Sequence, residues 1–239
     1  YFVFNFRDNE GTILVRNVRI VPKPGSGQLM SSGRDGFHCK GNRGRMIFDR
    51  CVLSGLGDDA FNISSMTGVV HRAVSNVELL VKGAFHPEMG HCRLAVGDQV
   101  ALYDPESNEI VHVSRLAAVE PLEEPSRPKL TRVTLGAPAG TLPAKCFVHN
   151  MDIPSPGAIV RNSDIAGSCR MRGPLLIENS TFRGFNWYYA SDIEGPFPRR
   201  VMIRDSHFIN DDPRNNRGDA LVFALPRFAD AVRGSGYDA

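Results

Sequence analysis

Short runs of alternating apolar and polar residues dominate the chain, and helical periodicity is scarce. Five seven-residue segments share one order: two apolar residues, a charged and a polar residue, a mostly small residue, a polar residue or Val, and a closing apolar residue. Each segment is too short to bury its apolar side alone, so the repeat predicts a parallel β-solenoid with a continuous core. The segments are residues 14–20, 47–53, 159–165, 176–182 and 202–208.

The fifth position of the repeat holds a small side chain in four segments, which predicts a ladder along the solenoid. A β-sandwich with strands that are similar by coincidence is the alternative, but a sandwich does not require neighbouring strands to resemble one another. Both interpretations give an all-β fold class. The ladder positions are Cys51, Ser163, Ser180 and Ser206.

An insertion interrupts the repeat. Val15 and Phe48 occupy the same position in their segments and are 33 residues apart, whereas Phe48 and Val160 are 112 residues apart. Between them, roughly residues 66–150 alternate or run apolar with turn signals, which fits a small antiparallel β-barrel or sandwich inserted between coils. We therefore expect a first β-helical part in residues 1–65, the barrel-like domain in residues 66–150 and a second β-helical part in residues 151–239.

Composition excludes several classes of protein. The 239 residues are 42% hydrophobic and 23% charged, an ordinary globular composition. The formal net charge of +2 gives no electrostatic case for a nucleic-acid or acidic-membrane partner. No stretch approaches 18 uninterrupted apolar residues, so we expect no membrane span. The five cysteines are scattered without zinc-ligand spacing, so we expect buried thiols.

The first residues bear on location and assembly. Residues 1–6 lack the basic region and the cleavage site of a signal peptide, and they read like a strand entered partway, as in a mature or trimmed fragment. We nevertheless expect a secreted or periplasmic location. Bare solenoid ends expose strand edges, so a homo-oligomer stays an open alternative.

Two short segments repeat one another at an offset of 24 residues, which is about one solenoid coil. Residues 35–39 (Asp-Gly-Phe-His-Cys) align with residues 59–63 (Asp-Ala-Phe-Asn-Ile). Strand alternation turns the Phe and the Cys or Ile of each segment inward, and it turns His38 and Asn62 outward together.

Each of these segments begins with an aspartate, Asp35 or Asp59, which strict alternation would point into the core. Because an unpaired buried charge is very costly, we expect a bend that brings both carboxylates onto an outer groove, with Asp58 beside them. Adjacent strands lie ~4.8 Å apart, so at least one of the three pKa values should rise. A raised carboxylic acid beside a carboxylate is what glycoside hydrolysis needs, while a calcium site or plain turn acids are alternatives.

Residues 34–38 (Arg-Asp-Gly-Phe-His) and 57–62 (Gly-Asp-Asp-Ala-Phe-Asn) resemble motifs of the right-handed parallel β-helix glycosidases. The chain resembles glycoside hydrolase family 110, the exo-acting α-1,3-galactosidases, which have Asp-Gly-x-His, then Asp-Asp-Ala-x-Asn, and then an inserted barrel. The resemblance covers roughly residues 10–225. The Asn-Thr-Asp, Gly-His-Gly and Arg-Ile-Lys motifs of the polygalacturonases are absent, which argues against pectin as substrate.

This resemblance implies an inverting exo-glycosidase that removes terminal α-1,3-linked galactose from an oligosaccharide or glycan, with no cofactor and no metal. The family's three aspartates fall on Asp35, Asp58 and Asp59. By analogy with the polygalacturonases, Asp58 is then the general acid, and Asp35 with Asp59 holds the attacking water. Inversion further implies a separation of roughly 6.5–9.5 Å between the acid and base carboxyl groups.

Outward-facing polar residues and one aromatic residue are candidates for binding sugar. His38 and Asn62 can bind substrate hydroxyl groups, or they can serve as structural ladder hydrogen bonds. Trp187, the only tryptophan, can offer its ring to a galactose C–H face or cap the solenoid core.

Two arginines and one glutamate complete the candidates. Arg34 and Arg161 can orient carboxylates or substrate hydroxyl groups. Glu194 matches an acidic-Gly-Pro turn of the family that the chain resembles, which implies a sugar contact.

Two other functions stay open. A calcium-dependent polysaccharide lyase would bind Ca²⁺ with the aspartates and use an arginine as the base, so a chelator would stop it. A non-catalytic carbohydrate-binding or adhesin-like β-helix would keep its ligand affinity when the aspartates are mutated, and it would release no sugar.

Overall fold

The computed structural model describes residues 2–65, 67–83, 93–107, 109–122, 129–153, 157–183 and 200–209. Within these ranges every regular element is a β-strand, which confirms the all-β class. No described residue belongs to a helix that is long and apolar enough to cross a membrane. The chain divides into two compact units, one that includes Ser65–Asp152 and one that includes the described residues on either side of that range.

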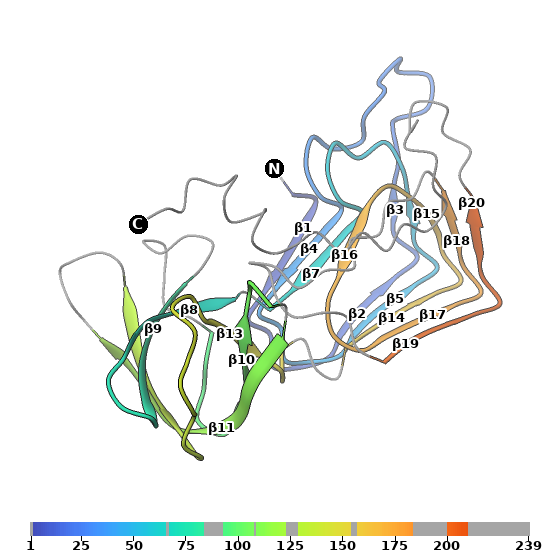
Figure 1. Cartoon of the computed structure of the whole chain (residues 1–239). Helices are drawn as coiled ribbons and strands as arrows, with labels where there is room; N and C mark the ends of the chain where they lie inside the picture. Colours follow the sequence, from blue (N-terminus) through green and yellow to red (C-terminus); the bar gives the residue numbers. More distant parts are fainter. Residues whose placement is uncertain are drawn as a thin grey trace. The chain divides into compact units, whose positions relative to one another are not determined.

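Three parallel sheets make up the unit outside Ser65–Asp152 (Figure 1). The chain visits the three sheets in the same order, and each such passage, here called a coil, pairs in register with the next. The first sheet holds β1 (Phe4–Arg7), β4 (Phe37–Lys40), β7 (Phe61–Ser64) and β16 (Cys169–Met171); the second holds β2 (Ile13–Arg16), β5 (Met46–Asp49), β14 (Ala158–Arg161), β17 (Leu175–Glu178) and β19 (Val201–Arg204); the third holds β3 (Arg19–Ile20), β6 (Val52–Leu53), β15 (Asp164–Ala166), β18 (Thr181–Arg183) and β20 (His207–Ile209).

The repeated apolar positions stack in register across the second sheet, as the repeat predicts. Val15 pairs with Phe48, Phe48 with Val160, Val160 with Ile177, and Ile177 with Ile203. Phe48, Val160 and Ile177 are fully buried. The 112 residues between Phe48 and Val160 in the sequence therefore span a single step in the sheet.

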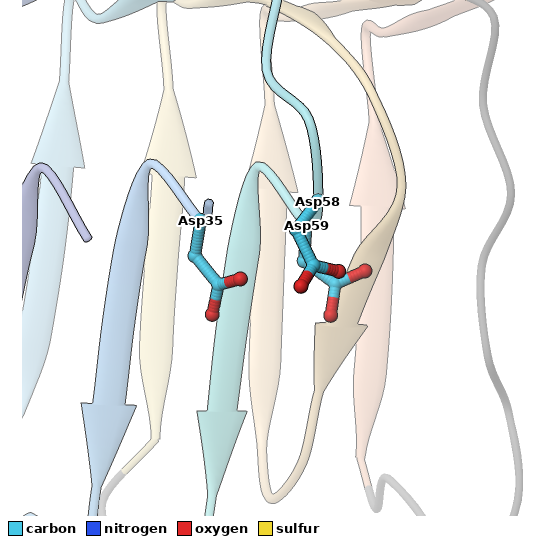
Figure 2. Close-up of side chains that lie close together, drawn as sticks. All are labelled: Asp35, Asp58 and Asp59. Atoms are coloured by element: carbon cyan, nitrogen blue, oxygen red, sulfur yellow. The ribbon is translucent and has the colours of Figure 1, made fainter. Parts of the chain in front are cut away.

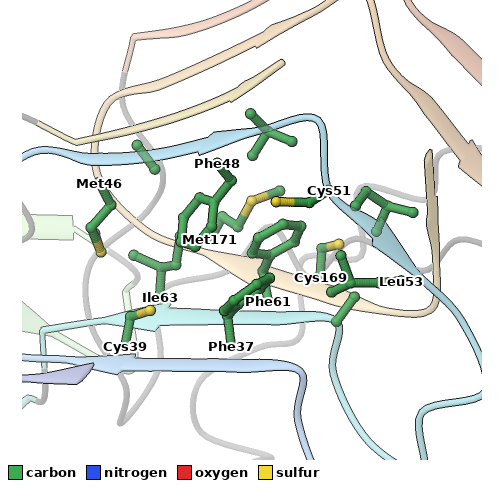
Figure 3. Close-up of a cluster of buried hydrophobic side chains, with 14 of the residues drawn as sticks. Phe37, Cys39, Met46, Phe48, Cys51, Leu53, Phe61, Ile63, Cys169 and Met171 are labelled. Carbon is green, nitrogen blue, oxygen red and sulfur yellow. The ribbon is translucent and has the colours of Figure 1, made fainter. Parts of the chain in front are cut away.

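Aromatic rings fill the middle of this core. Phe37 and Phe61 occupy matching positions of β4 and β7, with ring centroids 5.4 Å apart and ring planes inclined by 21°. Phe48 from the second sheet packs against both rings at 4.8 Å. Figure 3 shows these rings with Cys39 and Cys51 in the same cluster. The four cysteines within the described ranges are buried free thiols, as expected.

A ladder of serine hydroxyl groups runs along the turn between the second and third sheets. Cys51 N–H donates to Ser163 Oγ at 3.0 Å, Ser163 N–H to Ser180 Oγ at 3.1 Å, and Ser180 N–H to Ser206 Oγ at 3.2 Å. Each serine hydroxyl donates in turn to the carbonyl oxygen two residues earlier. The predicted small-residue ladder is confirmed, and it supplies partners for backbone groups at the turn.

At the same turn, one residue in each coil has the left-handed backbone conformation, which bends the chain. The φ angle is 58° at Asn17, 54° at Arg50, 53° at Asn162, 46° at Asn179 and 49° at Asp205. Asn and Asp tolerate this conformation better than other residues with a side chain, which explains their recurrence here. Arg50 is the exception, and its Nε donates to Asn17 Oδ1 at 2.8 Å.

The unit that includes Ser65–Asp152 is a closed antiparallel barrel of six strands, as the sequence predicts. Its core is separate from that of the parallel sheets and includes Leu79, Val100 and Val133. In barrel order the strands are β10 (Gln99–Asp104), β11 (Glu109–Leu122), β12 (Leu130–Leu135), β9 (Glu78–Gly83), β8 (Gly68–Ala73) and β13 (Phe147–Asn150).

Replacing Ser180 by Ala should lower the free energy of unfolding by roughly 1–3 kcal/mol, because the buried N–H of Ser163 would lose its acceptor. Urea unfolding followed by circular dichroism measures the change. Ser26→Ala is the matched control, since exposed Ser26 also donates one hydrogen bond and accepts one. Its effect should stay within about 0.5 kcal/mol. Equal losses in the two variants would contradict a stabilising ladder.

Candidate active site

Asp35 and Asp59 lie two residues before the paired strands β4 and β7, one coil apart. Backbone pairing extends back to them, since Gly36 N–H donates to Asp59 O at 2.9 Å and Phe37 N–H donates to Ala60 O at 3.0 Å. The register that stacks the aromatic core therefore also stacks the two aspartates, as the 24-residue offset predicts.

Two glycines allow neighbouring coils to approach closely beside the aspartates. A Cβ atom on Gly36 would lie 2.8 Å from a side-chain carbon of Leu53 and 2.9 Å from the backbone oxygen of Ala60. A Cβ atom on Gly57 would lie 3.0 Å from the backbone of Gly33. Larger residues at either position would push the turns that carry the acids apart.

Three carboxyl groups meet at this place (Figure 2). One oxygen from each of Asp35, Asp58 and Asp59 lies within 4.8 Å of the oxygens from the other two. The convergence expected from the sequence is thus present. The nearest oxygens are closer to one another than the roughly 6.5–9.5 Å expected between the carboxyl groups of an inverting pair.

The three carboxyl groups differ in exposure. The Asp58 side chain is 43% exposed, whereas those of Asp35 and Asp59 are only 3% exposed. The expectation that all three line an open groove is therefore wrong for Asp35 and Asp59. The reason is that neighbouring side chains contact both carboxyl groups, His38 that of Asp35, and Ser168 and Arg170 that of Asp59.

Asp35 has a histidine partner. His38 Nδ1 lies 2.6 Å from Asp35 Oδ2, and both side chains are buried. The ring of Phe2 stacks on the imidazole at 3.9 Å, with the planes inclined by 20°. His38 lies on the face of β4 opposite the core, as strand alternation predicts, and its contact with Asp35 restrains that carboxyl group.

Asp59 is held by side chains from the first coil after the barrel. Ser168 Oγ donates to Asp59 Oδ1 at 2.6 Å, and Arg170 Nε lies 3.1 Å from Asp59 Oδ2. The sequence interpretation missed both residues. They follow Asp59 by more than 100 positions, and residues 168–171 do not repeat the acidic motif that marks the two preceding coils.

Burial raises the pKa of Asp59 from 3.8 to about 6. The hydrogen bond from Ser168 and the charge of Arg170 lower this pKa, but they do not offset burial, to which the nearby charges of Asp58 and Asp35 add. The expectation that at least one of the crowded carboxyl groups has a raised pKa is confirmed for Asp59.

Two further candidates lie beside the aspartates. Arg34 Nη1 is 4.0 Å from Asp58 Oδ2. Asn62 Nδ2 is 3.5 Å from Asp59 Oδ2, and Asn62 Oδ1 accepts a hydrogen bond from Lys40 Nζ at 3.0 Å. Lys40 was not predicted, although its place two residues after His38 on the same side of β4 was a usable signal.

Arg161 belongs to the second sheet, and the structure does not bring it together with the three aspartates. Its Nη2 is 3.5 Å from Asp49 Oδ2, and Arg16 Nε contacts the same oxygen at 3.1 Å. Strand register places Arg16, Asp49, Arg161 and Glu178 in one row of alternating charge. Arg161 therefore has a structural partner in the neighbouring coil.

Two predicted binding residues, Trp187 and Glu194, lie outside the described residues. The aromatic platform for galactose and the acidic turn that they were expected to supply stay predictions.

Comparison with known proteins points to glycosidases. No family model matches the chain. It is 25% identical to alpha-1,3-galactosidase B of Bacteroides thetaiotaomicron over 214 residues, which cover 82% of this chain and 33% of that protein. Alpha-1,3-galactosidase A of Akkermansia muciniphila is 32% identical over 90 residues, covering 37% of this chain and 15% of that protein. Alpha-1,3-galactosidase A of Bacteroides fragilis is 35% identical over 51 residues, which cover 21% of this chain and 8% of that protein.

This partial similarity supports a relationship to glycosidases. The chain spans about a third of the length of the Bacteroides thetaiotaomicron protein and smaller shares of the other two.

Replacing Asp59 by Asn should remove a fall in stability between about pH 4 and about pH 6. The folded-state pKa of about 6 exceeds the ordinary 3.8, so the folded chain holds this proton more tightly than the unfolded chain does. Stability therefore decreases as the pH rises through this window, by an amount on the order of 3 kcal/mol. Urea unfolding of both proteins from about pH 3.5 to about pH 7.5 measures the difference.

Asp49→Asn is the contrasting variant. A hydrogen bond from Asn162 lowers the pKa of Asp49, and the charges of Arg161, Arg50 and Arg16 lower it further, against the effect of burial. Asp49 therefore stabilises the fold above its ordinary pKa of 3.8, and this contribution is lost as the pH falls through the lower folded-state pKa. The variant should be less stable than the parent at neutral pH. The difference in the free energy of unfolding between the two proteins should become smaller as the pH falls below 3.8. The same pH dependence in both variants would contradict these assignments.

Proposed function

We propose that the chain is part of an inverting exo-glycosidase of the glycoside hydrolase family 110 type, which removes terminal α-1,3-linked galactose from oligosaccharides or glycans. The observation that carries hydrolysis is the convergence of one exposed and two buried carboxyl groups, with one oxygen of each within 4.8 Å of the others, while inversion is taken from the family that the chain resembles. The names of the similar proteins agree with this substrate.

Asp58 is the proposed general acid. Its carboxyl group is the exposed member of the three, so it can reach the oxygen of a glycosidic bond in a bound sugar. Arg34, 4.0 Å away and 63% exposed, is placed to orient Asp58 or a neighbouring hydroxyl group. The acid protonates the leaving oxygen as the bond to the anomeric carbon breaks.

Asp35 and Asp59 are the proposed pair that holds and activates the water. A water that accepts or donates at about 2.8 Å to two oxygens bridges oxygens about 4.6 Å apart, which is compatible with the spacing of these carboxyl groups. With a pKa of about 6, Asp59 is largely ionised at neutral pH and is a stronger base than an ordinary aspartate.

The proposed scaffold is a right-handed parallel β-helix, with the three parallel sheets as its faces and the barrel as an insertion between residues 66 and 150. The recurring order of the sheets along the chain supports this arrangement. Outward residues of the first sheet, His38 and Asn62, are the proposed contacts for sugar hydroxyl groups. A secreted or periplasmic location belongs to the same proposal.

Asp58→Asn should lower kcat for an α-1,3-linked galactosyl oligosaccharide by about 10²–10⁴-fold, because the leaving oxygen would lose its proton donor. Asp164→Asn is the matched control, since Asp164 is 50% exposed and lies 3.2 Å from Arg183 but belongs to the third sheet. Both variants should unfold like the parent in urea. A fully active Asp58→Asn variant would remove Asp58 from the acid role.

The configuration of the first product tests the displacement. Proton NMR of the reaction in progress should show β-galactose before mutarotation, since a single displacement inverts the α-anomer. α-Galactose as the first product would instead indicate a covalent intermediate, with one of the close carboxyl groups as nucleophile.

A chelator separates hydrolysis from the calcium-dependent lyase. The proposed reaction uses only protein carboxyl groups and water, so excess EDTA should leave the rate of galactose release unchanged. Loss of activity that returns on adding Ca²⁺, together with an unsaturated product, would favour the lyase.

A further inference from the structure

The coil after the barrel closes around the carboxyl group of Asp59. Ala60 N–H donates to Ser168 O at 2.7 Å, so backbone pairing sets Ser168 beside the turn that carries Asp59. Ser168 Oγ then reaches Oδ1 at 2.6 Å, and Arg170 Nε reaches Oδ2 at 3.1 Å. One coil therefore supplies a hydrogen bond to one oxygen of this buried carboxyl group and an ion-pair contact to the other.

Electrostatics make the contact with Arg170 important. Two like charges, Asp58 and Asp35, face Asp59 from its own turn and from the preceding coil. Arg170 supplies positive charge from the following coil, and its side chain is 34% exposed, so it is only partly screened by water. Among the described residues, other groups near the three acids include Asn62 on β7, Cys169 on β16, His38 and Cys39 near Asp35, Lys40 on Asn62, and Arg34 beside Asp58.

We propose that Arg170 and Ser168 are positioning residues that keep Asp59 ionised and oriented as a base, an inference that rests on the proposed function. Arg170 favours the carboxylate over the carboxylic acid through its charge, and Ser168 fixes its orientation through Oδ1. Without them, the nearby acids and the burial of Asp59 would favour the protonated form, which cannot accept a proton from water.

The first test is the pH dependence of Arg170→Gln. Loss of the cation should move the acidic limb of kcat/KM for an α-1,3-linked galactosyl disaccharide to higher pH by about one unit. The kcat/KM of the variant should then be about one fifth of the parent value near pH 6 and should approach the parent value near pH 8. Arg170→Lys, which keeps the charge, should recover most of the parent profile.

Arg183→Gln is the matched control. Arg183 also pairs with an aspartate of a neighbouring coil, with its Nε 3.2 Å from Asp164 Oδ1, but both residues belong to the third sheet. Its profile should follow the parent at every pH. An Arg170→Gln profile that is lower by the same factor at every pH would show general damage to the site, and it would overturn the proposal.

The second test needs no turnover. The ¹³C resonance of the Asp59 carboxyl group, assigned by its absence in Asp59→Asn, should titrate at higher pH in Arg170→Gln than in the parent. An unchanged titration would overturn the proposal whatever the activity. If the titration moves but the parent protein releases no galactose, the control of Asp59 by Arg170 stands and the proposed function is wrong.

Ser168→Ala provides a variant that changes no charge. It should raise the midpoint of the Asp59 titration by less than Arg170→Gln does, and it should lower kcat more than it raises KM, because the base would be present but less well oriented. A Ser168→Ala variant with the parent titration and the parent kcat would remove Ser168 from the positioning role.

Discussion

In-register parallel pairing of β4, β7 and β16 is the constraint on which the candidate site depends. Each strand pair aligns one residue of a coil with one residue of the next, so side chains that occupy the same position become neighbours. Asp35 and Asp59 are brought together in this way, and Ser168 reaches Asp59 from the third coil. A slip of one residue in either pair would turn the aligned side chains to opposite faces and dissolve the cluster.

Burial gives the acids of these coils distinct electrostatic states. The pKa values of Asp49 and Asp59 move in opposite directions, because desolvation is the largest effect at Asp59 but not at Asp49. A hydrogen bond from Asn162 and three arginines outweigh the cost of burial at Asp49, which makes it a structural anion. At Asp59, Ser168 and the single arginine, Arg170, do not outweigh the effect of burial on the pKa. The nearby carboxyl groups of Asp58 and Asp35 raise the pKa of Asp59 further. The difference marks Asp59 as the carboxyl group that can exchange a proton near neutral pH, as the proposed base must.

Much of the fold was predictable because successive coils of a solenoid have similar sequences, so the repeat shows which residues stack. The match between residues 35–39 and 59–63 was enough to place Phe37 on Phe61 and to bring the aspartates together. The contribution of Ser168 and Arg170 was not predictable, since the inserted barrel separates them from Asp59 and their coil does not repeat the motif.

Two other features, the partner of Arg161 and the burial of two of the aspartates, are visible only in the structure. Arg161 sits in a repeat segment, but only strand register shows that Asp49 is its partner. The burial of Asp35 and Asp59 depends on contacts with His38, Ser168 and Arg170, and the sequence does not show how far these side chains cover the two carboxyl groups. The sequence thus indicated that the three aspartates meet, while their exposure and their other partners are set by the packing of the coils.

A crystal structure of the Asp58→Asn variant with a bound α-1,3-linked galactosyl disaccharide tests the central claim most directly. The account predicts that the glycosidic oxygen lies within hydrogen-bond distance of the residue 58 side chain. It also predicts a water that contacts both Asp35 and Asp59 on the opposite side of the anomeric carbon. A disaccharide bound away from the three residues, or an anomeric carbon that no water held by Asp35 and Asp59 can reach, would contradict it.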